Sequence, residues 1–241
     1  MPRSATYKKQ LDHAGDLKAR YPVPDAVNRL KAMGEVETKR KFKGAKKQKG
    51  FDQTVELVMH LGIDPKQADQ LIRGSLSLPH GVGKTKKVIV FCPDEMADDA
   101  KTAGAIEAGA DALIKKVSEG WSDFDVAIAH PAVMGKVGKL GRVLGPQGKM
   151  PSPKSGTVTP DLAQAIKEYS AGKLEYRNDT GGNVHAVIGK ISFPAEHLLA
   201  NLEAFVDHIR RLKPPASKGH YIKRVCLSAT MTPSICLDVQ S

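Results

Sequence analysis

The segment HGVGKT, residues 80–85, comes closest in residue types to nucleotide chemistry. Its Gly83-Lys84-Thr85 matches the last three positions of a P-loop, in which backbone N–H groups and a lysine hold phosphates. The first glycine of that motif would fall at Leu78, and a strand is predicted after Thr85, whereas a P-loop opens a helix. We therefore expect Lys84 to be an exposed charge beside a strand.

Residues able to bind metals or act as nucleophiles are present, but they form no recognised pattern. The eight histidines include no HxxxH or HExxH pair, and no G-x-S-x-G nucleophile elbow occurs. The three cysteines, Cys92, Cys226 and Cys236, include no CxxC pair, and their odd number argues against a disulfide framework. We expect reduced, mostly buried thiols in a protein that is not an enzyme and has no cofactor or metal.

Residues 134–158 contain six glycines, three prolines, five basic residues and no acid. Glycine lets the backbone approach a partner, proline fixes its path, and the basic side chains supply charge for phosphates. This composition predicts a long basic loop for phosphate contact, although a solvated surface loop explains it equally well. The basic residues are Lys136, Lys139, Arg142, Lys149 and Lys154.

Small polar side chains lie on one face of two predicted strands. Residues 51–61 alternate between an apolar face, which includes Phe51, and a polar face that includes Thr54. The strand before Pro233 has Ser228 and Thr230 on its polar face. Their hydroxyls can bond phosphates and 2′-hydroxyls of RNA, but threonine is also simply a good strand former. With 5% aromatic residues, base stacking is not the expected main mode of binding.

Positive charge is concentrated at the N-terminal end. Of a net charge of +11, residues 1–50 carry +9, and residues 39–49 contain seven basic residues and no acid. Such a run is usually a solvated segment, but beside an RNA surface it adds a salt-dependent attraction to phosphates. No apolar run approaches the roughly 20 residues of a membrane span, and no signal segment is visible, so we expect a cytoplasmic protein without membrane contact.

The outer parts of the chain predict helices and antiparallel strands. Residues 7–33 predict helical pieces broken at Pro22 and Pro24, with Asp25 as an N-cap. The best helix lies between Pro194 and Pro214. Its apolar residues recur at the spacing of one buried face: Leu198, Leu202, Phe205, Ile209 and Leu212.

The middle of the chain alternates short apolar strands with helices. Strands are predicted at residues 86–92 and 123–131, a helix at residues 94–108, and another helix with Thr159 as cap and Gly172 as stop. This alternation is typical of a parallel sheet with helices on both faces.

The predicted fold class is α/β. A discontinuous two-layer α+β domain with an antiparallel sheet, residues 1–81 and 173–241, carries an inserted three-layer Rossmann-like α/β domain, residues 82–172. Gly81 and Gly172 lie at the two crossings, where they could serve as hinges or as ordinary turn residues.

Several sequence blocks together resemble one known family. GRVLGPQGKMPSPKSGTV, residues 141–158, is similar to the signature of the first protein of the large ribosomal subunit, which is carried on the mobile stalk beside the tRNA exit site. The likeness covers nearly everything from Phe51 to Ser234 in the family's order. It includes FDQTVELVMHLGIDP, RGSLSLPHGVGK, GWSDFDVAIAHPAVM, EYRNDTGGNVHAVIGK and SATMTPS.

The resemblance implies a cytoplasmic ribosomal protein, a monomer when free, with three RNA partners. The first is large-subunit rRNA, which the discontinuous domain mainly binds. The second is exit-site tRNA, whose release the protein assists. The third is the leader of its own mRNA, whose translation it represses. The alternative from another class is a nucleotide-dependent enzyme that uses the inserted domain.

The resemblance also implies which residues contact rRNA. One departure is Thr232, because the family usually has Thr-Met-Gly where this chain has Thr230-Met231-Thr232, so a side chain stands where backbone and RNA should pack closely. The implied contact residues are Phe51, Thr54, Ser228, Thr230 and Met231, with Arg177, Asp179 and Lys218 as weaker transfers.

Overall fold

The computed structural model describes residues 4–36, 52–217 and 219–239 of a mixed α/β protein. The chain divides into two compact units. Unit 1 comprises Met1–Ile72, Leu78–Val82 and Tyr176–Ser241, and unit 2 comprises Arg73–Ser77 and Gly83–Glu175. The domain limits expected from the sequence, 1–81, 82–172 and 173–241, stay a prediction.

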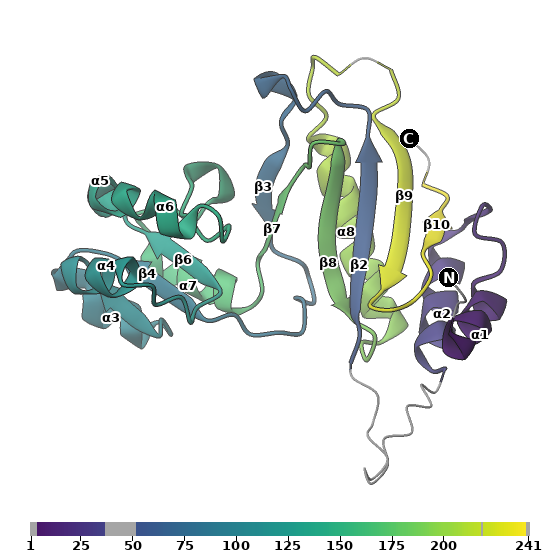
Figure 1. Ribbon diagram of the computed structural model, residues 1–241, viewed down its shortest axis with the longest axis horizontal. Coiled ribbons are helices and arrows are strands. Elements are labelled where there is room, and N and C mark those ends of the chain that lie inside the picture. The colour runs from purple at the N-terminus through teal and green to yellow at the C-terminus, as the bar shows by residue number, and fades with distance from the viewer. Residues whose placement is uncertain (1–3, 37–51, 218, 240–241) are drawn as a thin grey trace, which may run out of the picture. The chain divides into compact units, whose positions relative to one another are not determined.

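Unit 1 is built on a five-stranded sheet (Figure 1). Neighbouring strands are antiparallel except for β1, which runs parallel to β10. The strand order is β1 (Arg20–Tyr21), β10 (Ile235–Leu237), β9 (Ile222–Ala229), β2 (Thr54–Leu61) and β8 (Asn183–Lys190).

Helix α8 (Ala195–Arg211) covers one face of this sheet (Figure 1). A Cβ on Gly189 of β8 would lie 3.0 Å from Cδ2 of Leu198, so the strand and the helix approach closely there. The helix buries the predicted apolar residues except Leu212, which is exposed because it is the C-cap and lies beyond the last helical turn. The residues of β2 that alternate toward the helix are Val55, Leu57, Met59 and Leu61, all buried.

The N-terminal helices are α1 (Ala5–Ala14) and α2 (Val23–Gly34), and α2 packs against α8, β9 and β10. The predicted break at Pro24 is wrong, because proline is tolerated in the first turn, where its missing N–H has no helical acceptor. The N-cap is Pro22 and not Asp25. Strand β1 was not predicted, since two residues carry no periodic pattern.

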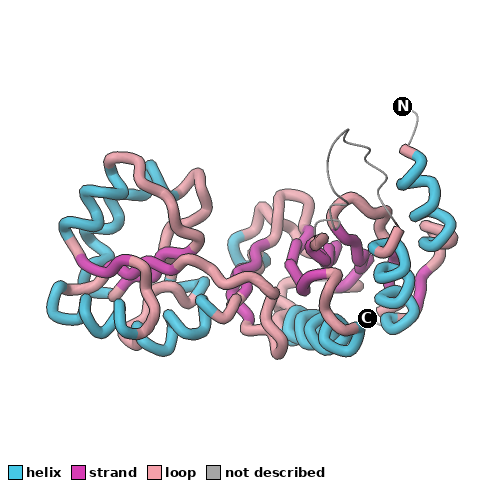
Figure 2. The backbone as a smooth tube through the Cα atoms, turned by 90° about the horizontal axis from the view of Figure 1, so that it is seen from below, coloured by secondary structure: helices cyan, strands magenta, loops and turns pink. Residues whose placement is uncertain are grey.

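Unit 2 contains a parallel three-stranded sheet with helices on both faces (Figure 2). The strand order is β5 (Glu107–Gly109), β4 (Val88–Phe91) and β6 (Val126–Ala129). One face packs against α3 (Ala97–Thr102) and α7 (Leu162–Ser170). The other packs against α4 (Asp111–Ser118), α5 (Met134–Val137) and α6 (Gly141–Leu144).

Three predictions in unit 2 are wrong. The helix expected to reach residue 108 ends at Thr102, and β5 follows after Gly104, whose φ of 113° favours glycine. The cap of α7 is Asp161, whereas the Thr159 hydroxyl accepts the Asp161 N–H at 3.2 Å. Residues 134–144 form successive helical turns, which include the 3-10 turn Gly138–Leu140, because their apolar residues are buried against β4 and β6.

Two short strands and a 3-10 turn are further elements of the structure. Strand β3 (Arg73–Leu76) pairs with β7 (Leu174–Arg177), and Ala68–Gln70 form a 3-10 turn. Among the described residues, none of the helices has the length and apolar character needed to span a membrane.

Candidate RNA-binding surface

The face of the five-stranded sheet opposite α8, which we call the open face, carries exposed and half-buried polar side chains. Strand register arranges these residues in rows across β8, β2 and β9. From the start of β2 to its end the rows are Lys190–Thr54, Val187–Glu56–Ser228, His185–Val58–Cys226 and Asn183–His60–Arg224.

At the start of β2, three residues form what we call the threonine cluster: Thr54, Lys190 and Thr230. The Lys190 ammonium donates to Oγ1 of Thr54 at 2.8 Å. The Thr230 hydroxyl accepts the Thr54 N–H at 3.2 Å, and the Thr230 N–H donates to the Thr54 carbonyl at 3.0 Å. These bonds hold a positive charge beside two hydroxyls, an arrangement suited to a phosphate or a 2′-hydroxyl.

The turn after β9 presents an apolar side chain next to this cluster. Met231 is 68% exposed and has φ 76°, a conformation uncommon outside glycine, so the turn projects its side chain away from the core. The Thr232 hydroxyl accepts the Ala229 N–H at 2.9 Å and donates to the Ala229 carbonyl at 3.1 Å. The Thr232 side chain, which stands where the resemblance implies a glycine, is therefore folded back onto its own turn.

Ser228 lies one row along from the threonine cluster, opposite Glu56 of β2. In the described part of the chain its hydroxyl makes no hydrogen bond, and the exposed Arg177 guanidinium at the end of β7 makes no hydrogen bond or ion pair. Both groups are therefore available to a partner.

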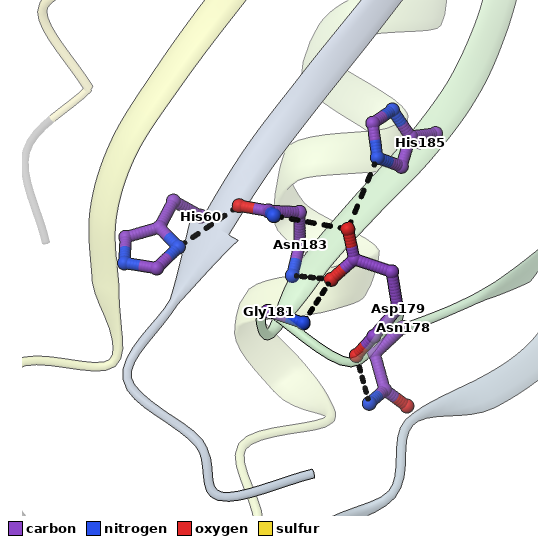
Figure 3. A network of polar contacts seen from close by, with 6 residues as sticks. All are labelled: His60, Asn178, Asp179, Gly181, Asn183 and His185. Atoms are coloured by element: carbon purple, nitrogen blue, oxygen red, sulfur yellow. Dashed lines mark hydrogen bonds and ion pairs between the residues drawn. The ribbon is translucent and has the colours of Figure 1, made fainter.

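Asp179 organises a second group at the other end of the open face, which we call the carboxylate cluster (Figure 3). Its carboxylate accepts the Gly181 N–H at 2.8 Å and the Asn183 N–H at 2.7 Å, and the Asn183 side-chain amide donates to it at 3.0 Å. His185 Nε2 lies 3.6 Å from the same carboxylate. The bonds from Asn183, then the other N–H groups, lower the pKa of Asp179 to about 2.

The carboxylate cluster also fixes His60. Because the Asn183 amide nitrogen faces Asp179, its oxygen faces His60 Nδ1 at 2.9 Å, and this nitrogen must carry the proton (Figure 3). Asp179 thus stabilises the turn between β7 and β8. Its carboxylate accepts hydrogen bonds from residues of this turn and of the start of β8.

The residues implied by the resemblance fall at two ends of one face. Thr54 and His60 are six residues apart on β2, which corresponds to about 20 Å at a rise of about 3.3 Å per residue. Thr54, Ser228, Thr230 and Met231 gather at one end and Asp179 lies at the other, whereas Phe51, Lys218 and the basic run 39–49 lie outside the described residues.

Two functional candidates were missed by sequence reasoning. Lys190 contacts the implied residue Thr54, and His60 contacts Asn183, which in turn binds Asp179. A lysine that ends one strand and a histidine within another carry no signal of their own. The pairing of β2 with β8, which the alternation of each strand does not specify, is what brings them into place.

The P-loop-like segment at residues 80–85 and the two predicted hinge glycines lie in ordinary strand and turn environments. Lys84 pairs with Asp125 at 3.6 Å, and strand β4, not a helix, follows Thr85. Gly81 and Gly172 have φ values of 61° and 102°, and their hinge role stays a prediction. Among the residues that the structure describes, no three His, Cys, Asp or Glu side chains could share a metal ion.

The basic side chains of residues 134–158 are partly used within unit 2. Lys136 pairs with Asp111 at 2.9 Å, and the Lys149 ammonium donates to the Ser122 carbonyl at 2.9 Å. Buried Tyr169 donates to the Ser155 carbonyl at 2.5 Å and anchors the end of this stretch. These interactions fit a packed segment better than a free loop.

Comparison with known proteins gives one consistent result. Residues 40–233 match the model described as the ribosomal protein L1p/L10e family. The chain is 45% identical over 238 residues to large ribosomal subunit protein uL1 of Thermobifida fusca (strain YX), which covers 99% of this chain and 95% of that protein. It is 55% identical over 188 residues to the protein of the same name from Lactobacillus johnsonii (strain CNCM I-12250 / La1 / NCC 533), covering 78% and 82%.

Proposed function

The chain belongs to the ribosomal protein L1p/L10e family, a family of structural proteins and not of enzymes, and we propose on this premise that it binds rRNA in the large ribosomal subunit. The observation that carries the choice of surface is the threonine cluster, where Lys190 and two hydroxyls stand beside exposed Met231. A cation, hydroxyls and an apolar side chain together can contact phosphate, ribose and base.

Charge along the open face favours contact at its two ends. Glu56 is exposed in the middle of the face and would repel phosphates, whereas Lys190 lies at one end and Arg224 lies toward the other. An RNA with two backbone segments about 20 Å apart would match this pattern.

We assign the finer architecture and partners on the same premise. Unit 1 is proposed as the rRNA-binding domain, and unit 2, with its parallel sheet between helices, as an inserted Rossmann-like domain that faces exit-site tRNA and assists its release. An mRNA leader that mimics the rRNA site would occupy the open face in place of rRNA. Competition between that leader and rRNA for the full chain tests this repression.

The first prediction concerns Thr230. Replacing it with valine keeps the side-chain shape but removes the hydroxyl, so we expect the complex with large-subunit rRNA to weaken by about 1 to 3 kcal/mol through an unpaired polar group. Binding to an unrelated RNA of equal length should change little, and the salt dependence should stay the same. Electrophoretic titration of both RNAs over a series of salt concentrations measures these effects.

The matched control is Thr230→Ser, which retains the hydroxyl and should bind rRNA like the parent. Lys190→Met should instead weaken binding to both RNAs and reduce the salt slope by about 0.9, the value for one neutralised phosphate. Thermal unfolding without RNA separates an effect on binding from an effect on the fold. If Thr230→Val binds rRNA as tightly as Thr230→Ser, the threonine cluster is not the recognition surface.

A further inference from the structure

Two cysteines lie directly opposite each other on β9 and β10, in unit 1. Cys226 and Cys236 are register partners in the antiparallel pair, and their Sγ atoms are 3.6 Å apart. Both are free thiols. A disulfide requires an Sγ–Sγ distance of about 2 Å and Cβ atoms about 4 Å apart, so facing residues of paired strands can form one by small side-chain rotations.

The surroundings of the pair favour a reaction between the two sulfurs. The Arg224 guanidinium donates to the Sγ of Cys236 from Nη2 at 2.8 Å and from Nε at 3.3 Å. The Cys236 thiol donates to the Leu17 carbonyl at 3.6 Å. Its hydrogen therefore points toward Leu17 and does not lie between the two sulfur atoms. A guanidinium hydrogen-bonded to the Cys236 sulfur is the charge environment found at reactive cysteines, whereas burial raises the pKa of the Cys226 thiol. The positive charge also argues against a bound cation at the pair.

Exposure assigns the two thiols different roles. Cys226 is half-buried on the open face, whereas Cys236 is 4% exposed beneath Arg224. A small oxidant therefore reaches Cys226 first, and Cys236 is the neighbour that can respond. Cys92, in unit 2, is buried and has no cysteine partner within the described residues.

We propose that Cys226 and Cys236 form a modification site at which peroxides make a reversible intramolecular disulfide. The Cys226 sulfur attacks the peroxide, the O–O bond breaks, and a sulfenic acid and one water are formed. The Cys236 sulfur then attacks the Cys226 sulfur, the S–O bond breaks, and a second water leaves. Two thiols are oxidised to one disulfide while one hydrogen peroxide is reduced to two waters.

The position of the bond gives the site its significance. A link between residues 226 and 236 closes the β9–β10 hairpin, whose turn contains Thr230, Met231 and Thr232. The oxidised hairpin has fewer conformations available than the reduced one. A disulfide formed in this way in a reducing compartment is transient, as in redox-sensing proteins, and not a permanent staple.

The test is peptide mapping by mass spectrometry after the reduced full-length chain is treated with hydrogen peroxide. We expect a peptide that joins Cys226 to Cys236 within one chain, with a mass loss of two hydrogen atoms that dithiothreitol reverses. Cys92→Ser is the matched control and should form the same bridge. Arg224→Gln should slow bridge formation severalfold, and Arg224→Lys should retain more of the parent rate.

Other products would contradict the proposal. Bridges that join two chains, a bridge that includes Cys92, or a Cys226 sulfinic acid with Cys236 still a thiol would each overturn it. The variant Cys226→Ser, which cannot form the bridge, provides a second measurement. Its peroxide-treated form should contain no linked peptide, and Cys236 should remain largely unoxidised, because it is covered by Arg224 and by the strand pair.

Discussion

At the scale of single residues, the candidate surface depends on side chains whose partners are distant in sequence. Thr54 is 136 residues from Lys190 and 176 from Thr230. The hydroxyls serve two purposes, because the Thr230 side chain joins the end of β9 to β2 while it faces outward. The internal bonds fix each hydroxyl in position, which would reduce the entropy lost on binding RNA at the proposed surface.

Asp179 allows a prediction of pH dependence. Its pKa is about 2 in the folded protein and 3.8 ordinarily, so the lowered value stabilises the fold above about pH 4, and this contribution is lost as pH falls toward 2. Asp179→Asn should lower the free energy of unfolding at pH 7 by up to about 1 kcal/mol, a modest effect because the carboxylate is partly exposed and screened.

Urea titrations of the parent and of Asp179→Asn at several pH values give the measurement. Asparagine retains an oxygen that can accept the Gly181 and Asn183 N–H groups, but its NH2 group replaces the oxygen that accepts the Asn183 side-chain amide, so the difference combines the loss of the charge with the loss of that hydrogen bond. The gap between the two proteins should close as the pH falls from 4 to 2. A gap that persists at pH 2 would mean that the carboxylate charge is not its source.

At the scale of elements, alternation predicted strands well and local composition predicted turns poorly. The apolar face of β2 and the buried face of α8 follow directly from sequence period. The glycine-rich residues 134–144 were expected to be a loop, since six glycines in residues 134–158 outweigh a sparse apolar pattern. Packing against β4 and β6 overrides that local preference, and packing partners are not visible in a short window.

The same limit applies to the candidate site. Polar faces on residues 51–61 and 224–230 were predicted from the sequence, but which strands are neighbours was not. The role of Lys190 follows only from the register of β8 with β2, and the folded-back Thr232 follows only from turn geometry. The sequence of a single strand does not specify which strands it pairs with, so a site assembled across strands has to be found in the structure.

Leu144 tests whether the glycine-rich stretch is a packed element. It is fully buried in the cluster that contains Trp121, the only tryptophan of the chain. Leu144→Ala should lower the free energy of unfolding of unit 2 by about 2 to 5 kcal/mol because it leaves a cavity. Tryptophan fluorescence during urea unfolding reports on this unit. The exposed neighbour substitution Arg142→Ala should change the midpoint little, and equal effects of both variants would favour a loop.

At the scale of the whole molecule, two kinds of RNA attraction are separated along the chain. Net charge is concentrated in residues 1–50, at +9 of +11, whereas the threonine cluster has one lysine among neutral groups. Charge attracts any nucleic acid and weakens with salt, whereas fixed hydroxyls and a shaped turn favour one RNA structure. We therefore expect the basic run to contribute affinity and the open face to contribute discrimination.

This division predicts different behaviour for two sets of variants of the full chain. Neutralising Lys46, Lys47 and Lys49 to glutamine should weaken binding to rRNA and to unrelated RNA alike, and should reduce the salt slope by up to about 0.9 for each phosphate that is no longer neutralised. Ser228→Ala should weaken only the rRNA complex, with an unchanged slope. Affinities for both RNAs at several salt concentrations decide the matter. If the lysine variants lose discrimination between RNAs and Ser228→Ala does not, recognition lies in the basic run and the open face is a scaffold for it.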